Sequence, residues 1–389
     1  MNSIAIIPAR GGSKRIPGKN VKEFEGQPII AYSIRAALDS RCFSEVMVST
    51  DSEEIAEVAR RYGAKVPFLR SPETSDDYAT TADVIREVLG MYADRGENFD
   101  ALCCIYATAP FVMPYRLRQG MRILESGRHE AAFTCVEYSY PVQRGLEIHP
   151  DGRIAMRWPE YAKARSQDLP KTYHDAGRFY FSTVEAFLRH GSLWGDDTAP
   201  IVLPELDVQD LDTETDWRLA EMKYRLTSFP SNMKADMFEL CSYTECSDML
   251  LLEALAERNR PEVRKYMLNE DPICVEDHFE FCRSLRHRRD KVYYLVMVGT
   301  AIVGSVNFQW IAEGTLERGI WVARDYRGKG VAKSVLPAAY AELHRRLGVK
   351  KIFTEVKEGN EASNALERSL GAKLVRSEKG MNYYELELG

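Results

Sequence analysis

A basic loop at residues 10–20, Arg-Gly-Gly-Ser-Lys-Arg-Ile-Pro-Gly-Lys-Asn, has the composition of an anion-binding site. It follows an apolar run, residues 4–7, that predicts a strand. Gly11 and Gly12 let the backbone approach an anion closely, and four cations accompany them: Arg10, Lys14, Arg15 and Lys19. The loop therefore predicts a cradle for a triphosphate. It is neither a Walker A loop nor a Rossmann fingerprint, because the Gly-Lys-Ser/Thr ending and the GxGxxG pattern are absent.

A second glycine-rich basic turn lies within residues 319–332. An apolar run leads into this turn and a helical pattern follows it. Consecutive backbone N–H groups at such a helix start can bind a pyrophosphate. Arg327, Gly330 and Ala332 have the spacing Arg-x-x-Gly-x-Ala. The order strand, loop and helix favours an anion site over a random surface turn.

Regular alternation of strands and helices positions the first loop. Apolar runs predict strands at residues 4–7, 46–49, 66–69, 102–106 and 131–136. Apolar residues at helical spacing predict helices at residues 28–40, 52–62, 81–93 and 114–125. This order predicts a doubly wound, mostly parallel α/β sheet of the Rossmann-like class. Ligands of such sheets bind beyond the carboxyl ends of the strands.

The pattern changes in the middle of the chain. Residues 141–175 are irregular and rich in Pro, Arg, Tyr and Trp, as expected of an inserted substrate-binding lobe, and a helix is predicted at 213–226. Periodicity is then lost, so we place a linker at 229–235 between two domains, 1–228 and 236–389.

Strands and helices also alternate in the second domain. Strands are predicted at 238–243, 292–298, 301–308, 316–323 and 351–356, and helices at 331–347 and 360–370. Pro337 falls inside the first of these helices and is expected to destabilise or kink it.

The totals support two domains, because 389 residues exceed what one hydrophobic core usually organises. A net charge of −6 argues against a nucleic-acid partner. The eight cysteines form no CxxC pair and no zinc-ligand spacing, and they predict buried thiols in a reducing compartment. No run approaches the ~20 apolar residues that span a bilayer, and no signal peptide is visible. We therefore expect a cytoplasmic protein without a membrane partner.

Residues 1–226 resemble the CMP-sugar synthetases that act on sialic acid and its relatives. The variant Ser13-Lys14-Arg15-Ile16-Pro17 is most similar to the pseudaminic acid branch of that family. Tyr106 stands where sialic acid synthetases have Gln, which favours a different nine-carbon sugar. Further matches are Ser49-Thr50-Asp51, Phe68-Leu69-Arg70, Ser75-Asp76-Asp77, Ala107-Thr108-Ala109-Pro110-Phe111, Arg165-Ser166-Gln167-Asp168-Leu169-Pro170 and Tyr173-His174-Asp175-Ala176-Gly177-Arg178-Phe179-Tyr180.

This resemblance implies transfer of CMP from CTP to a nonulosonic acid, with Arg10 and Lys19 as catalytic cations. Arg165 is the expected clamp for the sugar carboxylate, because a guanidinium binds it in a bidentate way. His174 is interpreted as a structural or hydrogen-bonding residue and not as a general base. The expected nucleotide- and sugar-binding residues are Ala9, Gly11, Gly12, Ser13, Lys14, Asn20, Arg70, Tyr106, Thr108, Arg165, Gln167, Tyr173 and Asp175.

Nucleotidyl transfer also needs the phosphate charge neutralised, and Mg²⁺ held by oxygen ligands supplies much of this. Asp210 and Asp212 are the candidate ligands, because residues two apart on a strand face the same side and can reach one ion. Asp-x-Asp is a weak motif by itself. Its match to the family's Asp-x-Asp, followed here by Asp216 and Trp217, gives it more weight.

Residues 236–389 resemble the GNAT acetyltransferase superfamily, which implies an α+β fold and acetyl-CoA as the cosubstrate. The segments Asn360-Glu361-Ala362-Ser363 and Leu370-Gly371-Ala372 match the end of that fold. Residues expected to bind acetyl-CoA are Val322, Arg327, Gly328, Lys329, Gly330, Val331, Ala332 and Asn360.

The expected catalytic residues of this domain are Ser363 and Glu317. Many GNAT enzymes protonate the CoA thiolate with a tyrosine, but Glu367 stands at that position here, so Ser363 is the expected donor. Glu317 could help to deprotonate the amine through water. Residues 258–267 resemble the acetyltransferase of pseudaminic acid synthesis, which implies the 4-amino group of a UDP-linked sugar as the acceptor.

The two resemblances together predict a bifunctional enzyme of small-molecule sugar and nucleotide substrates that forms a homodimer through its first domain. Three alternatives stay open. The sugar could be legionaminic or sialic acid, the second domain could acetylate protein N-termini, or one domain could be an inactive binding module. The intact loops at 10–20 and 327–332 argue against the last alternative.

Overall fold

The computed structural model describes residues 1–13 and 15–389. The chain forms two compact units, Met1–Leu226 and Thr227–Gly389. The expectation of a linker at residues 229–235 was wrong. Residues Asn232–Ala235 form strand β11, which pairs antiparallel with β12, Phe238–Ser242, inside the second unit. Met233 and Ala235 are buried in that unit's core, so this segment belongs to the second fold.

The first unit contains a six-stranded sheet in the order β10-β6-β9-β5-β1-β4. Strand β9 runs antiparallel to both of its neighbours, whereas β1 is parallel to β4 and β5, and β10 is parallel to β6. The predicted mostly parallel sheet is confirmed. The strands are β1 Ser3–Pro8, β4 Glu45–Ser49, β5 Ala101–Ile105, β6 Ala131–Glu137, β9 Tyr173–Thr183 and β10 Thr198–Leu203, and a small hairpin consists of β2 Glu23–Phe24 and β3 Gln27–Pro28.

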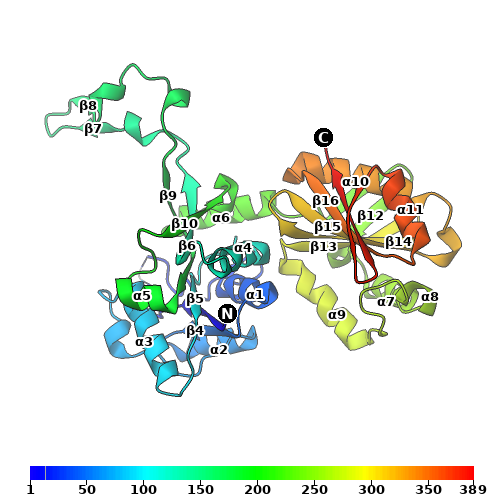
Figure 1. Ribbon diagram of the computed structural model, residues 1–389, viewed down its shortest axis with the longest axis horizontal. Helices are drawn as coiled ribbons and strands as arrows, with labels where there is room; N and C mark the ends of the chain where they lie inside the picture. Colours follow the sequence, from blue (N-terminus) through cyan, green and yellow to red (C-terminus); the bar gives the residue numbers. More distant parts are fainter. Residues whose placement is uncertain (14) are drawn as a thin grey trace. The chain divides into compact units, whose positions relative to one another are not determined.

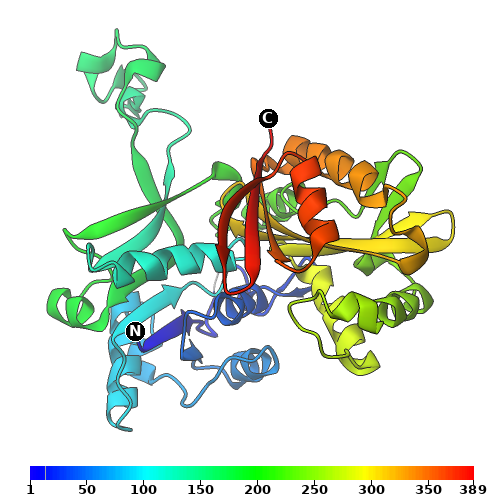
Figure 2. The same ribbon diagram turned by 45° about the vertical axis from the view of Figure 1, so that its right-hand side comes forward.

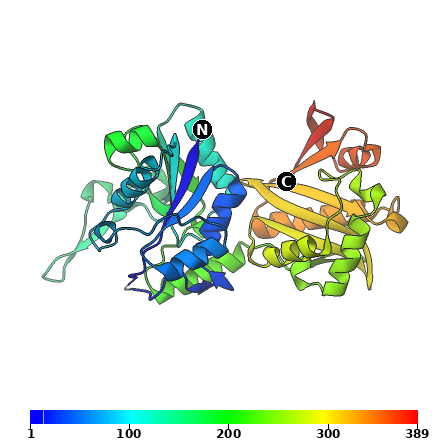
Figure 3. The same cartoon turned by 90° about the horizontal axis from the view of Figure 1, so that it is seen from below.

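Helices cover both faces of this sheet, as Figure 3 shows. Alternate residues of β1 divide between the faces. Ala5 and Ile7 pack in the cluster that contains α1, α2 and α4, whereas Ile4 and Ile6 pack with α3 and α5. The helices are α1 Ile30–Ser40, α2 Glu53–Arg61, α3 Thr81–Ala93, α4 Pro114–Glu125, α5 Val184–His190 and α6 Glu214–Leu226.

One strand predicted in this unit is wrong, and strands β9 and β10 were not predicted. Residues 66–69 form no strand, and the neighbouring Lys65 makes only an isolated bridge to Met47. Strand β9 was missed, because its first three residues are exposed and only its later part has the apolar character of a buried strand. Strand β9 returns the chain from the irregular region to the centre of the sheet.

The irregular residues 138–172 form an arm that leads away from the sheet (Figures 1 and 2). Its tip is a two-stranded hairpin of β7, Leu146–Ile148, and β8, Ile154–Met156. The side chains of Leu146, Ile148 and Ile154 are 60%, 78% and 63% exposed. An apolar surface of this kind in an extended arm is typical of an interaction site.

The second unit contains an eight-stranded sheet in the order β11-β12-β13-β14-β15-β16-β18-β17. All neighbouring strands are antiparallel except β15 and β16. The remaining strands are β13 Lys291–Val298, β14 Ala301–Ala312, β15 Thr315–Val322, β16 Lys351–Lys357, β17 Lys373–Glu378 and β18 Met381–Glu387. The last two strands, red in Figure 2, were not predicted, because β17 is exposed along its whole length.

Two helix layers cover this sheet from opposite sides (Figure 1). Tyr294 and Val296 pack with α10, Val331–Leu347, whereas Leu295 and Met297 pack with α7, Asp248–Arg258, and α9, Val275–Ser284. Two further helices are α8 Pro261–Arg264 and α11 Glu361–Ser369. Helix α10 continues through Pro337 without a break, so the expected cost at that residue is offset by burial of Val335, Leu336 and Ala339. In the described part of the chain, no helix combines the length and hydropathy that crossing a membrane requires.

The packing around β11 predicts where the chain can be divided. A fragment of residues 227–389 retains β11, and it retains the Pro230 carbonyl, which accepts a hydrogen bond of 2.6 Å from the Tyr294 hydroxyl. A fragment of residues 236–389 lacks both and exposes β12 as an edge. We expect the shorter fragment to be less stable by about 3 kcal/mol, from the lost burial of Met233 and Ala235 and the unpaired Tyr294 hydroxyl. Urea unfolding of the two fragments measures this difference, and equal midpoints would contradict it.

Candidate active sites

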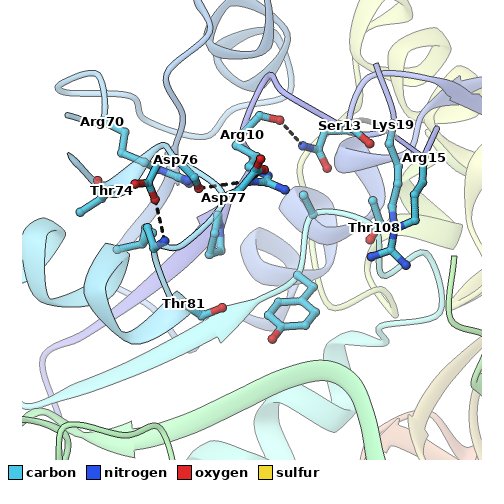
Figure 4. A pocket seen from close by; sticks show the side chains of 16 residues that line it. Arg10, Ser13, Arg15, Lys19, Arg70, Thr74, Asp76, Asp77, Thr81 and Thr108 are labelled. Carbon is cyan, nitrogen blue, oxygen red and sulfur yellow. Dashed lines mark hydrogen bonds and ion pairs between the residues drawn. The ribbon is translucent and has the colours of Figure 1, made fainter. Parts of the chain in front are cut away.

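A cavity of 590 Å³ lies in the first unit, at the carboxyl ends of β1 and β5. Figure 4 shows Arg15 and Lys19 on one side of it, and Arg70, Thr74 and Asp76 on the other. The predicted site residues that line it are Arg10, Ser13, Lys19, Asn20, Arg70, Tyr106 and Thr108. The structure thus gathers cations and hydroxyls from three separate stretches of sequence around one space, as binding of a triphosphate requires.

Hydrogen bonds to Ser49 and Asp51, and one bond within the loop, hold the loop that follows β1. The Ala9 N–H donates to the Ser49 carbonyl at 2.9 Å, and the Gly11 N–H donates to Asp51 Oδ1 at 2.8 Å. The Asn20 amide donates to the Arg10 carbonyl at 2.9 Å and closes the loop. Ala9, Gly11 and Gly12 support the loop without lining the cavity, and Lys14 lies outside the described residues.

Two acidic residues that the sequence prediction left without a role also line the cavity. Arg10 Nη1 is 2.9 Å from Asp77 Oδ1 and donates to the Asp76 carbonyl at 3.1 Å. On the same side of the cavity as Asp76, the buried Arg70 donates to the Ser49 hydroxyl at 3.0 Å and to the Ser49 carbonyl at 2.5 Å. Burial lowers the pKa of Arg70. The match of Ser75-Asp76-Asp77 to the resembled family was the signal that could have identified this acidic wall.

Asp210 and Asp212 follow a short turn and belong to no strand, so that premise of the prediction was wrong. Leu211 between them is 1% exposed, and its burial turns both neighbouring side chains away from the core. The Asp212 carboxylate forms an ion pair with Arg15 and lies 3.8 Å from Lys19 Nζ. Because Arg15 and Lys19 both line the cavity, Asp212 stands directly beside it. Burial lowers the pKa of Lys19, whereas Asp212 and Asp210 raise it.

The predicted sugar-binding residues after position 160 are not assembled around this cavity. Arg165 and Gln167 lie on the arm, and Tyr173 lies at its base. His174 Nδ1 bonds to the Asp175 carbonyl at 2.9 Å, as its interpretation as a hydrogen-bonding residue requires. Arg165 and Gln167 thus do not line this cavity, and their role in binding the sugar stays a prediction.

Asp175 does not line the cavity but is connected to it through Tyr180 and Tyr106. Its carboxylate accepts a hydrogen bond of 2.7 Å from the Tyr180 hydroxyl, and the Tyr180 ring lies 5.4 Å from that of Tyr106, which lines the cavity. Burial raises the pKa of Tyr106. Tyr106 thus lines the cavity with a neutral side chain.

A second cavity, of 1060 Å³, lies in the other unit. Strands β15 and β16 pair only from Thr315 to Glu317 and then separate, so the rest of β15 has no partner on that side. The predicted residues that line this cavity are Glu317, Val322, Arg327, Gly328, Gly330, Val331, Ala332, Asn360 and Ser363, whereas Lys329 does not. A free strand edge beside a helix N-terminus offers backbone N–H groups to an extended, anionic ligand.

The glycines of this loop have backbone conformations that L side chains rarely adopt. Gly328 and Gly330 have φ angles of +74° and +81°, and Gly330 is the N-cap of α10. Arg327 Nε donates to the Val322 carbonyl at 3.1 Å, which fixes the loop against the end of β15. The turn therefore presents the start of α10 to the cavity.

In comparisons with known proteins, the two units of the chain match different families. Residues 4–144 match the cytidylyltransferase family, and 42% of 226 residues are identical to pseudaminic acid cytidylyltransferase of Campylobacter jejuni, over 58% of this chain and 97% of that protein. The chain belongs to the cytidylyltransferase family. The CMP-N,N'-diacetyllegionaminic acid synthase of Legionella pneumophila is 33% identical over 229 residues, 57% of this chain and 95% of that one.

Residues 248–373 match the acetyltransferase (GNAT) domain. Among solved structures, the Campylobacter jejuni N-acetyltransferase PseH in complex with acetyl coenzyme A is 20% identical, with 39% of this chain and 99% of that chain covered and a TM-score of 0.32. The second unit of this member of the cytidylyltransferase family thus contains the match to the acetyltransferase (GNAT) domain.

The GNAT cavity has a polar wall that the sequence prediction missed. Ser305, Asn307 and Gln309 alternate along β14 and all line the cavity. The Ser305 hydroxyl is 3.1 Å from that of the buried Tyr243, and Asn307 Oδ1 would lie 2.5 Å from a Cβ placed at Gly319. The signal was the period-two run of polar residues in an otherwise apolar strand.

Glu367, which stands at the position of the usual acid, is engaged in a buried ion pair with Arg318. The side chains of Arg318 and Glu367 are 4% and 3% exposed, and Arg318 Nε also donates to the Tyr340 hydroxyl at 3.1 Å. Asn360 caps α11, because its side-chain oxygen accepts from the Ser363 N–H at 3.2 Å. Glu367 therefore holds α11 against the sheet, and Ser363 is presented to the cavity one turn earlier.

We predict that Glu367→Gln destabilises the GNAT unit by about 3–5 kcal/mol, because it leaves the buried Arg318 charge without its counter-charge. Chemical unfolding of residues 227–389 measures this loss. The matched control is Glu361→Gln on the exposed side of the same helix, which should cost less than about 1 kcal/mol. An unchanged stability with a lowered turnover would instead make Glu367 part of the chemistry.

Proposed function

We propose that the cytidylyltransferase unit transfers CMP from CTP to pseudaminic acid and releases pyrophosphate, and that the GNAT unit N-acetylates a UDP-linked 4-amino-4,6-dideoxy sugar. The observation that carries the first half is the cavity in which Arg10, Arg15, Lys19 and Arg70 converge on one space. The higher identity to the pseudaminic acid enzyme, 42% against 33%, favours that sugar over legionaminic acid.

In the reaction, the sugar's anomeric hydroxyl releases its proton to solvent and its oxygen bonds to the α-phosphorus of CTP, while the bond to the β-phosphate breaks and pyrophosphate leaves. Arg10 and Lys19 neutralise the charge that grows on the phosphates, with Ser13 and Asn20 donating hydrogen bonds. Arg10 then exchanges Asp77 for a phosphate oxygen. Tyr106 and Thr108 lie at the carboxyl end of β5 and line the part of the cavity that we assign to the sugar.

Mg²⁺ fits this site only as an ion shared with the nucleotide. Within residues 1–13 and 15–389, no group of three or more His, Cys, Asp or Glu side chains could hold a metal. Mg²⁺ bound with phosphates needs only one or two carboxylates, and Asp212 beside the cavity, with Asp210, provides them. When bound, the ion would neutralise phosphate charge. Arg15 would then leave Asp212 for the triphosphate.

The arm supports the proposal that the enzyme is a homodimer formed through its cytidylyltransferase unit. Leu146, Ile148 and Ile154 at its tip present apolar area that association would bury. Arg165, Gln167, Tyr173 and Asp175 remain proposed sugar-binding residues, and Arg165 would reach a cavity through such an assembly. With small soluble substrates and a net charge of −6, we propose a cytoplasmic enzyme without nucleic-acid or membrane partners.

In the GNAT unit, we assign acetyl-CoA to the opening between β15 and β16. Its pyrophosphate would lie against the turn from Arg327 to Ala332, with Lys329 outside the cavity as a surface charge. The acceptor amine attacks the thioester carbon and the CoA sulfur leaves. Glu317 takes the amine proton through water, and Ser363 donates a proton to the sulfur. The polar wall of Ser305, Asn307 and Gln309 suits a hydroxylated acceptor such as a sugar.

The test of the sugar assignment is pyrophosphate release from CTP and Mg²⁺ with pseudaminic, legionaminic and sialic acids supplied separately. We expect the highest kcat/KM with pseudaminic acid. A preference for one of the other acids would overturn this assignment while leaving the cytidylyltransferase activity in place.

We predict that Asp212→Asn lowers nucleotidyl transfer by on the order of 10²-fold or more, because asparagine keeps the shape but lacks the charge that holds the cation. Acetyl transfer by the same preparation should be unchanged, since its site lies in the other unit. Turnover near that of the unmodified enzyme at saturating Mg²⁺ would falsify the metal assignment. Asp216→Asn is not a suitable control, because Asp216 accepts from the Thr213 N–H at 2.8 Å at the start of α6.

We predict that Ser363→Ala lowers kcat for acetyl transfer roughly 10- to 100-fold with little change in acetyl-CoA affinity. The hydroxyl assists the departing thiolate mainly in the transition state, so its loss affects turnover. Steady-state kinetics and calorimetric acetyl-CoA binding separate the two effects. A large loss of affinity would make Ser363 a cofactor-positioning residue, and an unchanged kcat would assign proton donation to another group such as Tyr326.

A further inference from the structure

The residues 208–212, which we call the acidic segment, have neither helical nor strand structure, yet cations from three parts of the fold bind their carbonyl groups. Lys223 of α6 donates to the Val208 carbonyl at 2.7 Å. Arg178 of β9 donates to the Gln209 carbonyl at 2.5 Å. Lys19 of the phosphate loop donates to the Leu211 carbonyl. Backbone groups that a sheet would have satisfied are thus satisfied by charged side chains.

Arg178 is the most deeply placed of these cations. It is 3% exposed, its guanidinium lies 5.5 Å from the Phe111 ring centre, and its Nε has no hydrogen-bond partner among the described residues. Burial lowers the pKa of Arg178 to about 10, and the carboxylates of Asp210 and Asp207 oppose that shift. Arg178 is therefore charged near neutral pH. Burying a guanidinium whose hydrogen bonds are not all satisfied costs stability.

The effect of these bonds is to fix the direction of both carboxylates. With the carbonyls of Val208, Gln209 and Leu211 held, the Leu211 side chain enters the core and the side chains of Asp210 and Asp212 point outward. The Leu211 N–H donates to Asp210 Oδ1 at 2.9 Å, which sets the rotamer of that carboxylate. Without Arg178, the Gln209 peptide could rotate and take Asp210 with it.

We infer that Arg178, together with Lys223, is a positioning residue of the cytidylyltransferase, which holds the acidic segment so that Asp210 and Asp212 can bind a divalent cation with the nucleotide. This inference rests on the proposed metal role of the two aspartates. Arg178 contacts neither the nucleotide cavity nor the reacting atoms, and it acts through the backbone of residue 209.

The test is Mn²⁺ binding to the full-length enzyme with CTP and no sugar, measured by electron paramagnetic resonance of free Mn²⁺. We expect Arg178→Gln to weaken Mn²⁺ binding on the order of 10-fold or more, as is usual for residues that orient metal ligands. Arg178→Lys and Lys223→Met should weaken it by smaller factors. CTP affinity in EDTA should stay within about 3-fold of that of the unmodified enzyme, because the phosphate loop is unchanged.

If Arg178 acted only through its charge, its removal would change Mn²⁺ affinity in the opposite direction. Removing a cation near two carboxylates strengthens their attraction for a metal, so tighter Mn²⁺ binding by Arg178→Gln, with Arg178→Lys unchanged, would overturn the positioning role. The matched control is Arg116→Gln, which removes a buried guanidinium on α4, 4% exposed, and should affect only stability.

Two further results distinguish this inference from the proposed metal role of Asp210 and Asp212, on which it rests. If Asp212→Asn weakens Mn²⁺ binding and the Arg178 variants do not, the metal site stands and the positioning role is wrong. If Asp212→Asn binds Mn²⁺ normally, the metal assignment fails and the inference fails with it. Should Arg178→Gln not fold, Lys223→Met decides, because normal Mn²⁺ binding by that variant would also overturn the inference.

Discussion

Ile16 of the phosphate loop and Leu211 of the acidic segment are buried in one apolar cluster, and the arrangement of charges around the nucleotide cavity depends on this packing. Both side chains are at most 1% exposed, and they join a group of aromatic rings from the β2–β3 hairpin, α1 and α6. Phe24 lies at its centre, 5.6 Å from the Trp217 ring and 5.4 Å from that of Tyr224. Burial of each of the two aliphatic side chains contributes roughly 1.5–3 kcal/mol.

This cluster explains why opposite charges lie side by side at the cavity. Arg15 precedes Ile16 and Asp212 follows Leu211, so packing the two apolar residues together places the ion pair directly above them. The cations of the loop and the Asp212 carboxylate then lie together beside the same cavity. A phosphate loop by itself could bind an anion, but the carboxylates for a cation come only through this tertiary contact.

The GNAT unit depends on a different constraint, the separation of two parallel strands. Beyond Glu317, strand β15 loses its partner β16, and the ion pair of Arg318 with Glu367 holds α11 at the resulting opening. The turn from Arg327 to Ala332 and Ser363 therefore line the same cavity.

The sequence by itself determined the two loops, the class of each fold and most helices, because these depend on local composition and on periods of two and 3.6 residues. Helices Thr81–Ala93, Pro114–Glu125 and Val331–Leu347 were predicted to the residue, since their caps and apolar stripes are local signals. The tertiary structure decided the rest. Strand β17 is exposed throughout, and the assignment of residues 232–235 to the second sheet depends on pairing with β12, which no local pattern records. Only the structure shows that Asp212 pairs with Arg15, that Arg178 donates to the Gln209 carbonyl and that Arg165 lies on the arm. Contacts between segments that are distant in sequence follow from packing and not from spacing along the chain.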